Sequence, residues 1–271
     1  MKRLAAALTA SALAMGLSQS VYAEQISHTW RFDSDSIAGI GSGGYAKDAT
    51  DPFNYDSDKG LNTTVSGWYD DGTTLANGND YLRHWSGLSF DQPGESAPWH
   101  GVDNKGPDEI LVFEFDEAIS LQSFKFGYAK EYTGSSYKSQ ADATVLYRNE
   151  ADANATGTGN LDASSMSGLT AMGYSVLGHF GDVASNVNKD ISSLTQGITS
   201  KVWAIGAYIG ALGGSGTKYG SVGTGWKDAF KLHSIAGVST TPDDTPGEVP
   251  TPATLALLGL GGLLLRSRRS R

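Results

Sequence analysis

The stretch EILVFEFDEAISLQSFKFGY, residues 109–128, decides the fold prediction. In residues 109–116, and again in residues 119–128, aromatic and aliphatic side chains recur at alternate positions, which is the period of a strand with one buried face. Only Glu117 and Ala118 separate the two runs. We therefore expect a β-hairpin that is joined by this tight connection and whose aromatic face lies in the core.

The rest of the chain extends this pattern. Glycine is frequent, at 35 of 271 residues, and no long stretch has the period of a helix; one short helix is predicted around residues 184–194. Residues 33–60 and 69–108 are polar and are predicted to be long loops. The chain is therefore predicted to be all-β, an antiparallel β-sandwich of jelly-roll-like type. Six further strand-like runs bounded by turn residues support this: 26–32, 61–68, 143–148, 174–180, 202–209 and 230–238.

The N-terminus has the composition of a secretory signal peptide. Lys2 and Arg3 precede an apolar run over residues 4–17, and a polar stretch then ends in Val21-Tyr22-Ala23. Small residues at positions −3 and −1 suit signal peptidase. We expect residues 1–23 to be a signal peptide that is cut between Ala23 and Glu24.

The C-terminus contains a second targeting pattern. Residues 239–248 form an acidic, proline-bearing linker that lacks the apolar side chains needed for a core. The segment 249–271 then places a short motif, an apolar run and a basic tail in succession. The 13 apolar residues would make about 20 Å of helix, short of the ~20 residues that a stable span needs. We expect a temporary transmembrane anchor over 253–265, with the basic tail on the cytoplasmic side. The motif is Val249, Pro250, Thr251 and Pro252; the anchor begins at Ala253 and ends at Leu265; the basic residues are Arg266, Arg268, Arg269 and Arg271.

Composition narrows the classes of function. The chain has no cysteine, which rules out disulfides, thiolate metal sites and cysteine nucleophiles. The whole chain has 20 basic and 29 acidic residues; without the six basic residues of its two ends, the domain over residues 24–238 and its linker carry 14 − 29 = −15. Such an acidic body should repel nucleic acid and attract cations.

No catalytic residues stand out. The five histidines make no zinc-type pair, and no serine elbow is present. The glycine-rich segment 39–44 matches a dinucleotide-binding pattern in letters alone, because no hydrophobic strand precedes it. A catalytic pair of carboxylates of the glycosidase type stays an open alternative, although no feature of the sequence selects two particular acids.

Two binding hypotheses remain for the body. The acids Asp103, Asp108 and Asp228 flank predicted strands and are candidate calcium ligands, with solvated surface acids as the alternative. The tryptophans Trp68, Trp85 and Trp99 fall in or beside the polar loops and are candidate sugar-contacting residues, with ordinary core packing as the alternative. No cofactor is required by the sequence; calcium is the one candidate.

The tail VPTPATLALLGLGGLLLRSRRSR, residues 249–271, resembles the PEP-CTERM sorting signal of bacterial exosortase systems, with Thr251 where that signal has Glu. The body also resembles exosortase-dependent surface proteins. The residues that carry this resemblance are 100–104 (HGVDN), 108–116 (DEILVFEFD), 176–180 (VLGHF), 203–208 (WAIGAY) and 228–232 (DAFKL).

The resemblance implies export in a Gram-negative, exopolysaccharide-producing bacterium. It further implies removal of the tail near Pro250–Pro252 by an exosortase, after a transient stage in the inner membrane, and delivery to the cell surface or extracellular matrix. No enzymatic activity is implied. We expect a non-catalytic structural or polysaccharide-associated protein. The alternatives are a carbohydrate-binding or calcium-dependent adhesion module and a secreted polysaccharide hydrolase.

Overall fold

The computed structural model describes residues 24–32, 53–84, 87–90, 100–149, 161, 165–223 and 225–240. Strands dominate these residues, and the only helical turns in the same ranges are three short 3₁₀ segments. The 3₁₀ segments are η1 (Asn79–Tyr81), η2 (Met166–Met172) and η3 (Gly210–Leu212). The strands are β1 (Gln25–Arg31), β2 (Phe53–Asp56), β3 (Asn62–Asp70), β4 (Leu75–Asn77), β5 (Leu82–His84), β6 (Leu88–Phe90), β7 (Val102–Asp103), β8 (Glu109–Thr133), β9 (Ser136–Lys138), β10 (Gln140–Arg148), β11 (Tyr174–Ala184), β12 (Asn188–Asp190), β13 (Ser200–Ala207), β14 (Lys218–Tyr219) and β15 (Lys227–Thr240).

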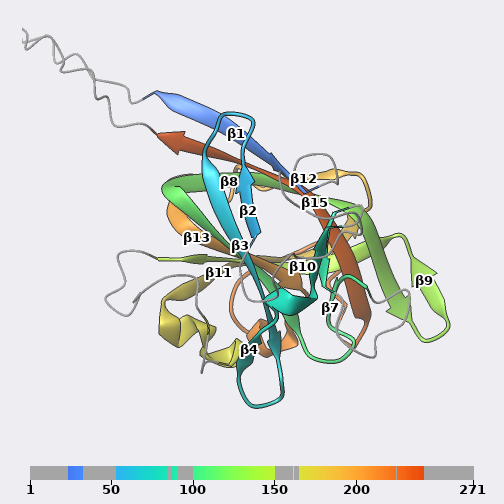
Figure 1. Cartoon of the computed structure of the whole chain (residues 1–271). Helices are drawn as coiled ribbons and strands as arrows, with labels where there is room; N and C mark the ends of the chain where they lie inside the picture. Colours follow the sequence, from blue (N-terminus) through green and yellow to red (C-terminus); the bar gives the residue numbers. More distant parts are fainter. Residues whose placement is uncertain are drawn as a thin grey trace, which may run out of the picture. The chain divides into compact units, whose positions relative to one another are not determined.

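Hydrogen bonds join these strands into one sheet, whose main path is β14-β11-β10-β13-β8-β15-β6-β5. The pairs β10–β11, β10–β13, β8–β13 and β8–β15 are antiparallel, whereas β11 and β14 run parallel. The prediction of an all-β fold is therefore confirmed. β8 lies in the middle of the path and is the long green strand in Figure 1.

The predicted hairpin over residues 109–128 is wrong, because both runs belong to the single strand β8. A two-residue hairpin of type I′ or II′ needs a positive φ in its turn. Neither Glu117 nor Ala118 has one. The interruption is instead an irregularity in the pairing with β13, where Ser200 faces Ile119 and Val202 faces Glu114. The chain kinks locally and continues as a strand.

Two other local predictions are also wrong. The segment predicted as a helix, residues 184–194, contains β12, which pairs with β8 through Lys189 and Phe124. The predicted loops 33–60 and 69–108 contain β2 and β4 to β7 among their described residues. Tertiary pairing outweighs local propensity in such short strands, because each is completed by hydrogen bonds to a distant partner.

The core has two parts, one on each face of β8. Phe113 and Phe115 point into a large aromatic cluster that also holds Phe124 and Phe126 from the second half of the strand. Val112, one position along, points into a second cluster. The first half of β8 is therefore buried on both faces, and the prediction of a single buried face holds only in part.

A buried polar network lies within this core, between β10 and β11. Thr144 faces His179 in the strand register, and Thr144 Oγ1 lies 2.9 Å from His179 Nδ1. The histidine Nε2 lies 3.2 Å from the Leu212 carbonyl and 3.1 Å from the Ser215 carbonyl, so Nε2 carries the proton. Thr144 then donates to Nδ1 and accepts from the Ile209 amide at 3.0 Å. Every polar atom of both side chains has a partner.

Among the described residues, no helix is long and apolar enough to cross a membrane. The predicted signal peptide (1–23), most of the linker (239–248) and the sorting tail (249–271) lie outside the described residues, as do Trp85 and Trp99. The predictions on these segments stay predictions.

Candidate functional site

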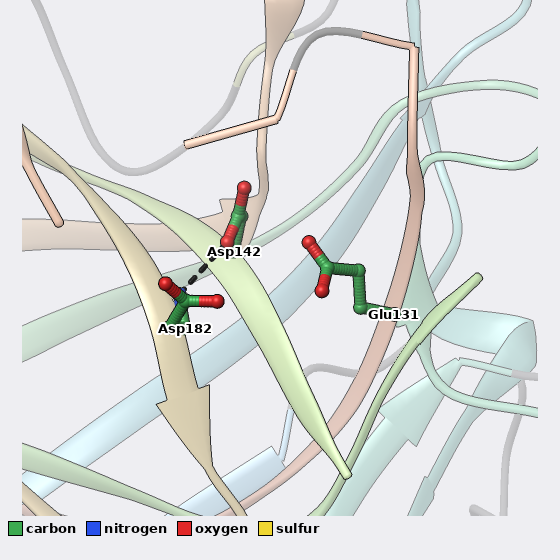
Figure 2. Close-up of side chains that lie close together, drawn as sticks. All are labelled: Glu131, Asp142 and Asp182. Carbon is green, nitrogen blue, oxygen red and sulfur yellow. Dashed lines mark hydrogen bonds between the residues drawn. The ribbon is translucent and has the colours of Figure 1, made fainter. Parts of the chain in front are cut away.

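Three carboxylates from three strands meet at one point: Glu131 from β8, Asp142 from β10 and Asp182 from β11. One oxygen of each lies within 4.8 Å of the others. Figure 2 shows the Glu131 side chain reaching across toward the two aspartates. Glu131 and Asp142 are fully buried, whereas Asp182 is exposed. We refer to these three residues as the acidic cluster.

A β-bulge between β10 and β11 positions the two aspartates. Ala141 pairs with Val183 and Ala143 pairs with Phe180, so that Asp142 alone faces Gly181 and Asp182. The extra residue on β11 gives Asp182 a φ of 56°, which is uncommon for a residue other than glycine. The Asp182 amide donates to Asp142 Oδ1 at 2.9 Å, the dashed line in Figure 2. The Asp142 carboxylate therefore helps to hold the bulge in which Asp182 lies.

The glycine-rich segment before β15 closes one side of the cluster. The Gly223 amide donates to Asp142 Oδ2 at 2.7 Å. The same segment packs tightly on β11, since a Cβ added to Gly181 would lie 2.6 Å from the carbonyl carbon of Ser221. Glycine at position 181 is therefore required for the close approach of the two backbones.

Glu131 is paired at one of its oxygens only. Oε2 accepts from Gln140 Nε2 at 3.0 Å and lies 3.2 Å from Lys138 Nζ, on a side chain that is half exposed. Gln140 Nε2 also contacts Asp182 Oδ1. Oε1, in contrast, is buried and has no hydrogen-bond partner. A buried carboxylate oxygen without a partner is costly, and such groups are rare in native structures.

A fourth acid, Asp228, accepts a hydrogen bond from the backbone of Asp142. Asp228 is fully buried, and its Oδ1 accepts from the Asp142 amide at 2.8 Å. Its Oδ2 accepts from Asn104 Nδ2 at 3.3 Å, and its own amide donates to Asn104 Oδ1 at 2.8 Å. Asp228 thus fastens the 104 region and β15 to the strand that carries Asp142.

The electrostatics of the site favour a proton or another cation. Burial raises the pKa of Asp142 to about 6, against the backbone hydrogen bonds from Asp182 and Gly223, and the Glu131 and Asp182 charges raise it further. Burial likewise raises the pKa of Asp228 to about 7, with the charges of Asp142 and Glu131 adding to the shift. The protein surroundings therefore stabilise the charged forms of these two carboxyls less well than water does.

The predicted calcium ligands are not brought together. Asp103 is buried, and its Oδ1 accepts a hydrogen bond at 2.8 Å from the Lys105 amide, two residues along the chain. Asp108 lies near Asp70 instead, and burial, with the Asp70 charge adding, raises its pKa to about 6 against Lys227. Of the three predicted ligands, only Asp228 touches the acidic cluster. The ligand set Asp103, Asp108 and Asp228 stays a prediction; among the described residues, the carboxylates that lie close enough together to share an ion are Glu131, Asp142 and Asp182.

Of the three tryptophans predicted to contact a sugar, Trp68 alone lies among the described residues. Trp68 is only 2% exposed, packs in the second core cluster and donates from Nε1 to Ser66 Oγ at 2.9 Å. Its ring therefore offers no face to a sugar, and it is a core residue. Trp226 is partly exposed, and Lys138 Nζ lies 4.3 Å from its ring centroid, beside the acidic cluster.

Sequence reasoning missed Glu131, Asp142 and Asp182. The signal was weak but present for the two aspartates, since each is a lone acid among small and apolar residues, as in ADATVLY over 141–147 and HFGDVA over 179–184. An acid that interrupts a buried strand has a specific partner more often than an acid in a polar loop does.

Comparisons with protein-family models, with curated proteins and with solved structures find no match to this chain.

Proposed function

We propose that this protein is an exported, non-catalytic surface or extracellular-matrix protein that an exosortase processes at its C-terminal tail. The observation that carries the proposal is the tail itself: the motif Val249–Pro252, a 13-residue apolar run and four arginines in succession. In this proposal the tail holds the chain in the inner membrane temporarily. Signal peptidase and exosortase are its processing partners, and exopolysaccharide is its final environment.

The arrangement of β1 and β15 supports the proposal that the chain is cleaved both before the domain and after it. β1 pairs with β15, the blue and orange-red strands that lie side by side in Figure 1. His28 Nε2 lies 2.9 Å from Ser239 Oγ, and the Phe32 amide donates to the His233 carbonyl. The two strands therefore run in opposite directions, so that the start of β1 and the end of β15 lie together. Removing the chain beyond either one leaves the core contacts of the described residues intact.

We also propose that the sheet folds over as a β-sandwich around its aromatic cluster. The two halves of β8 have different neighbours, since residues 110–115 pair with β3 and β13 whereas residues 119–132 pair with β15. Aromatic side chains from both halves nevertheless share one core cluster. A long strand that changes partners and encloses one core is typical of sandwiches and jelly rolls.

Burial of the acidic cluster supports the non-catalytic part of the proposal. A glycosidase places its two carboxyls in a groove that a sugar can enter. Here Glu131 and Asp142 have no exposed surface. The same cluster favours a calcium-dependent module as the second candidate, because buried carboxylates in excess suit a cation.

The experiment is the intact mass of the protein secreted by its host, in cells with and without the exosortase. We expect a mature N-terminus at Glu24 and a C-terminus near residues 250–252, with uncut chain in the inner membrane when the exosortase is absent. Recovery of extracellular protein that still ends at Arg271 would overturn the proposal.

A further inference from the structure

We propose that Glu131, Asp142 and Asp182 bind one calcium ion that fastens β8, β10 and β11 together. The inference concerns the folded domain and does not depend on how the chain is exported. It could fail while the sorting proposal holds, and the reverse is also true.

The spacing of the oxygens fits a single ion. Calcium binds oxygen ligands at 2.3–2.6 Å, so that two ligands of one ion lie no more than about 5 Å apart. In the acidic cluster one oxygen from each residue lies within 4.8 Å of the others. Three strands therefore already hold three ligands at the separation that one coordination sphere requires.

The observation that points to an ion is the Glu131 carboxylate. This side chain has no exposed surface, it is directed at the two aspartates, and its Oε1 has no hydrogen-bond partner (Figure 2). Lys138 does not supply what is missing, because its Nζ lies by Oε2, which Gln140 also contacts. A cation between the carboxylates would give Oε1 the partner that the protein does not.

The remaining hydrogen bonds leave oxygen lone pairs for coordination. Gln140 Nε2 contacts one oxygen of Glu131 and one oxygen of Asp182, and it does not use the second oxygen of either side chain. Asp142 accepts one amide at each oxygen, from Asp182 and from Gly223, and each carboxylate oxygen has a second lone pair. These amides fix the carboxylate in place without occupying all of its capacity. An exposed Asp182 leaves one side of the ion open to water, which commonly completes a calcium sphere.

The ligand chemistry selects calcium over other ions. The cluster consists of carboxylates alone, and softer metals such as zinc and copper favour histidine or cysteine. Magnesium requires a near-ideal octahedron at 2.0–2.1 Å and keeps most of its water. Three rigidly held carboxylates, two of them buried, suit the larger and less hydrated ion.

The test is thermal melting of the intact chain, stripped with EDTA and titrated with calcium chloride. At a calcium concentration about 100-fold above the dissociation constant, we expect the melting temperature to rise by about 5–10 °C. Magnesium at the same concentration should give a clearly smaller rise. No rise with millimolar calcium, or an equal rise with magnesium, would overturn the assignment.

Two variants test the ligands. Glu131→Gln keeps the shape and the contacts of Oε2 while removing the charge, and Asp182→Asn changes an exposed side chain that the fold tolerates. Both should lose most of the calcium-induced rise. Glu117→Gln is the matched control, because Glu117 is an exposed glutamate on the same strand. If all three variants respond to calcium as the unmodified chain does, the cluster is not the site.

A second readout does not depend on stability. Terbium replaces calcium at oxygen sites and emits when a nearby tryptophan is excited. Trp226 is close, since Lys138 Nζ lies 4.3 Å from its ring centroid and 3.2 Å from Glu131 Oε2. We expect terbium emission that calcium displaces and that Trp226→Phe reduces without abolishing the calcium-induced melting shift. Emission that survives in Glu131→Gln would contradict the site.

Discussion

The strand pair β10–β11 contributes to two polar clusters, which differ in whether the protein supplies a partner for every buried polar atom. Thr144 and His179 form a neutral network in which each polar side-chain atom has a protein partner. Two positions before Thr144 and three positions after His179, Asp142 and Asp182 lie in a bulge and meet Glu131, whose Oε1 has no partner. The same two strands therefore hold one network that the chain completes and one that it leaves incomplete.

The chemical type of a buried group sets which partners it requires. A hydroxyl and an imidazole each both donate and accept, so that two carbonyls and one amide suffice to complete them. Carboxylates only accept, and three of them repel one another in a medium of low dielectric constant. Burying acids together therefore calls for a cation or a proton; Lys138 supplies a positive charge at Glu131 Oε2, whereas Oε1 has no partner.

The largest effect should come from breaking the completed network. His179→Ala removes the donor to the Leu212 and Ser215 carbonyls and the acceptor for Thr144, and it opens a cavity. We expect a loss of about 3 kcal/mol in the free energy of unfolding, measured by chemical denaturation. The loss should be the same with calcium and with EDTA. Thr144→Ser, which keeps the hydroxyl, is the control, and a calcium-dependent loss would show that the two regions are not separate.

Glu131→Gln should change the stability of the acidic cluster with opposite sign in the two conditions. In EDTA the variant removes a buried charge and should gain about 1 kcal/mol, because its amide can donate to a neighbouring aspartate. In saturating calcium the unmodified chain should be the more stable of the two. Chemical denaturation in EDTA and in calcium measures the free energy of unfolding of both proteins and so tests this reversal. If the variant were less stable than the unmodified chain in EDTA as well, the protein itself would already stabilise the Glu131 charge.

Asp108 offers a half-buried carboxyl outside the cluster, and its effect should depend on pH alone. Its pKa is raised from 3.8 to about 6, so the folded state holds the proton more tightly than the unfolded state does. Its contribution to stability is therefore greatest below pH 4 and declines as the pH rises from about 4 to about 6. Relative to the unmodified chain, Asp108→Asn should gain about 2–5 °C in melting temperature over that range. A gain that varies with calcium would place Asp108 at an ion site after all.

The smallest effect is expected from Lys138. Its ammonium group lies 3.2 Å from Glu131 Oε2 on a half-exposed side chain, and it competes weakly with an ion for the same charge. Lys138→Met should tighten calcium binding by no more than about fivefold in a terbium-displacement titration, because exposed ion pairs contribute little. Lys201→Met, on an exposed position of β13, is the control. Weaker binding in Lys138→Met would show that the lysine orders the site instead of opposing it.

The sequence predicted much of the fold and little of the site. Alternation around Phe113 and Phe124 predicted strand structure at both positions, because a period of two is a local property of the chain. It did not reveal that both runs form one strand, since that depends on which distant strands complete their hydrogen bonds. Asp228 was predicted as a calcium ligand, whereas the carboxylates that lie together, Glu131, Asp142 and Asp182, come from three separate strands.

The sequence alone was enough to predict several of the strands, an acidic body without cysteine, and end segments whose composition predicts export and sorting. The tertiary structure alone decided that β8 is continuous, that Trp68 is buried, and that Glu131, Asp142 and Asp182 meet. The physical reason is that a β-bulge of one residue, held by the Asp182 and Gly223 amides, sets where these carboxylates point. Contacts between residues 11 to 51 positions apart leave no period in the sequence that a local pattern could detect.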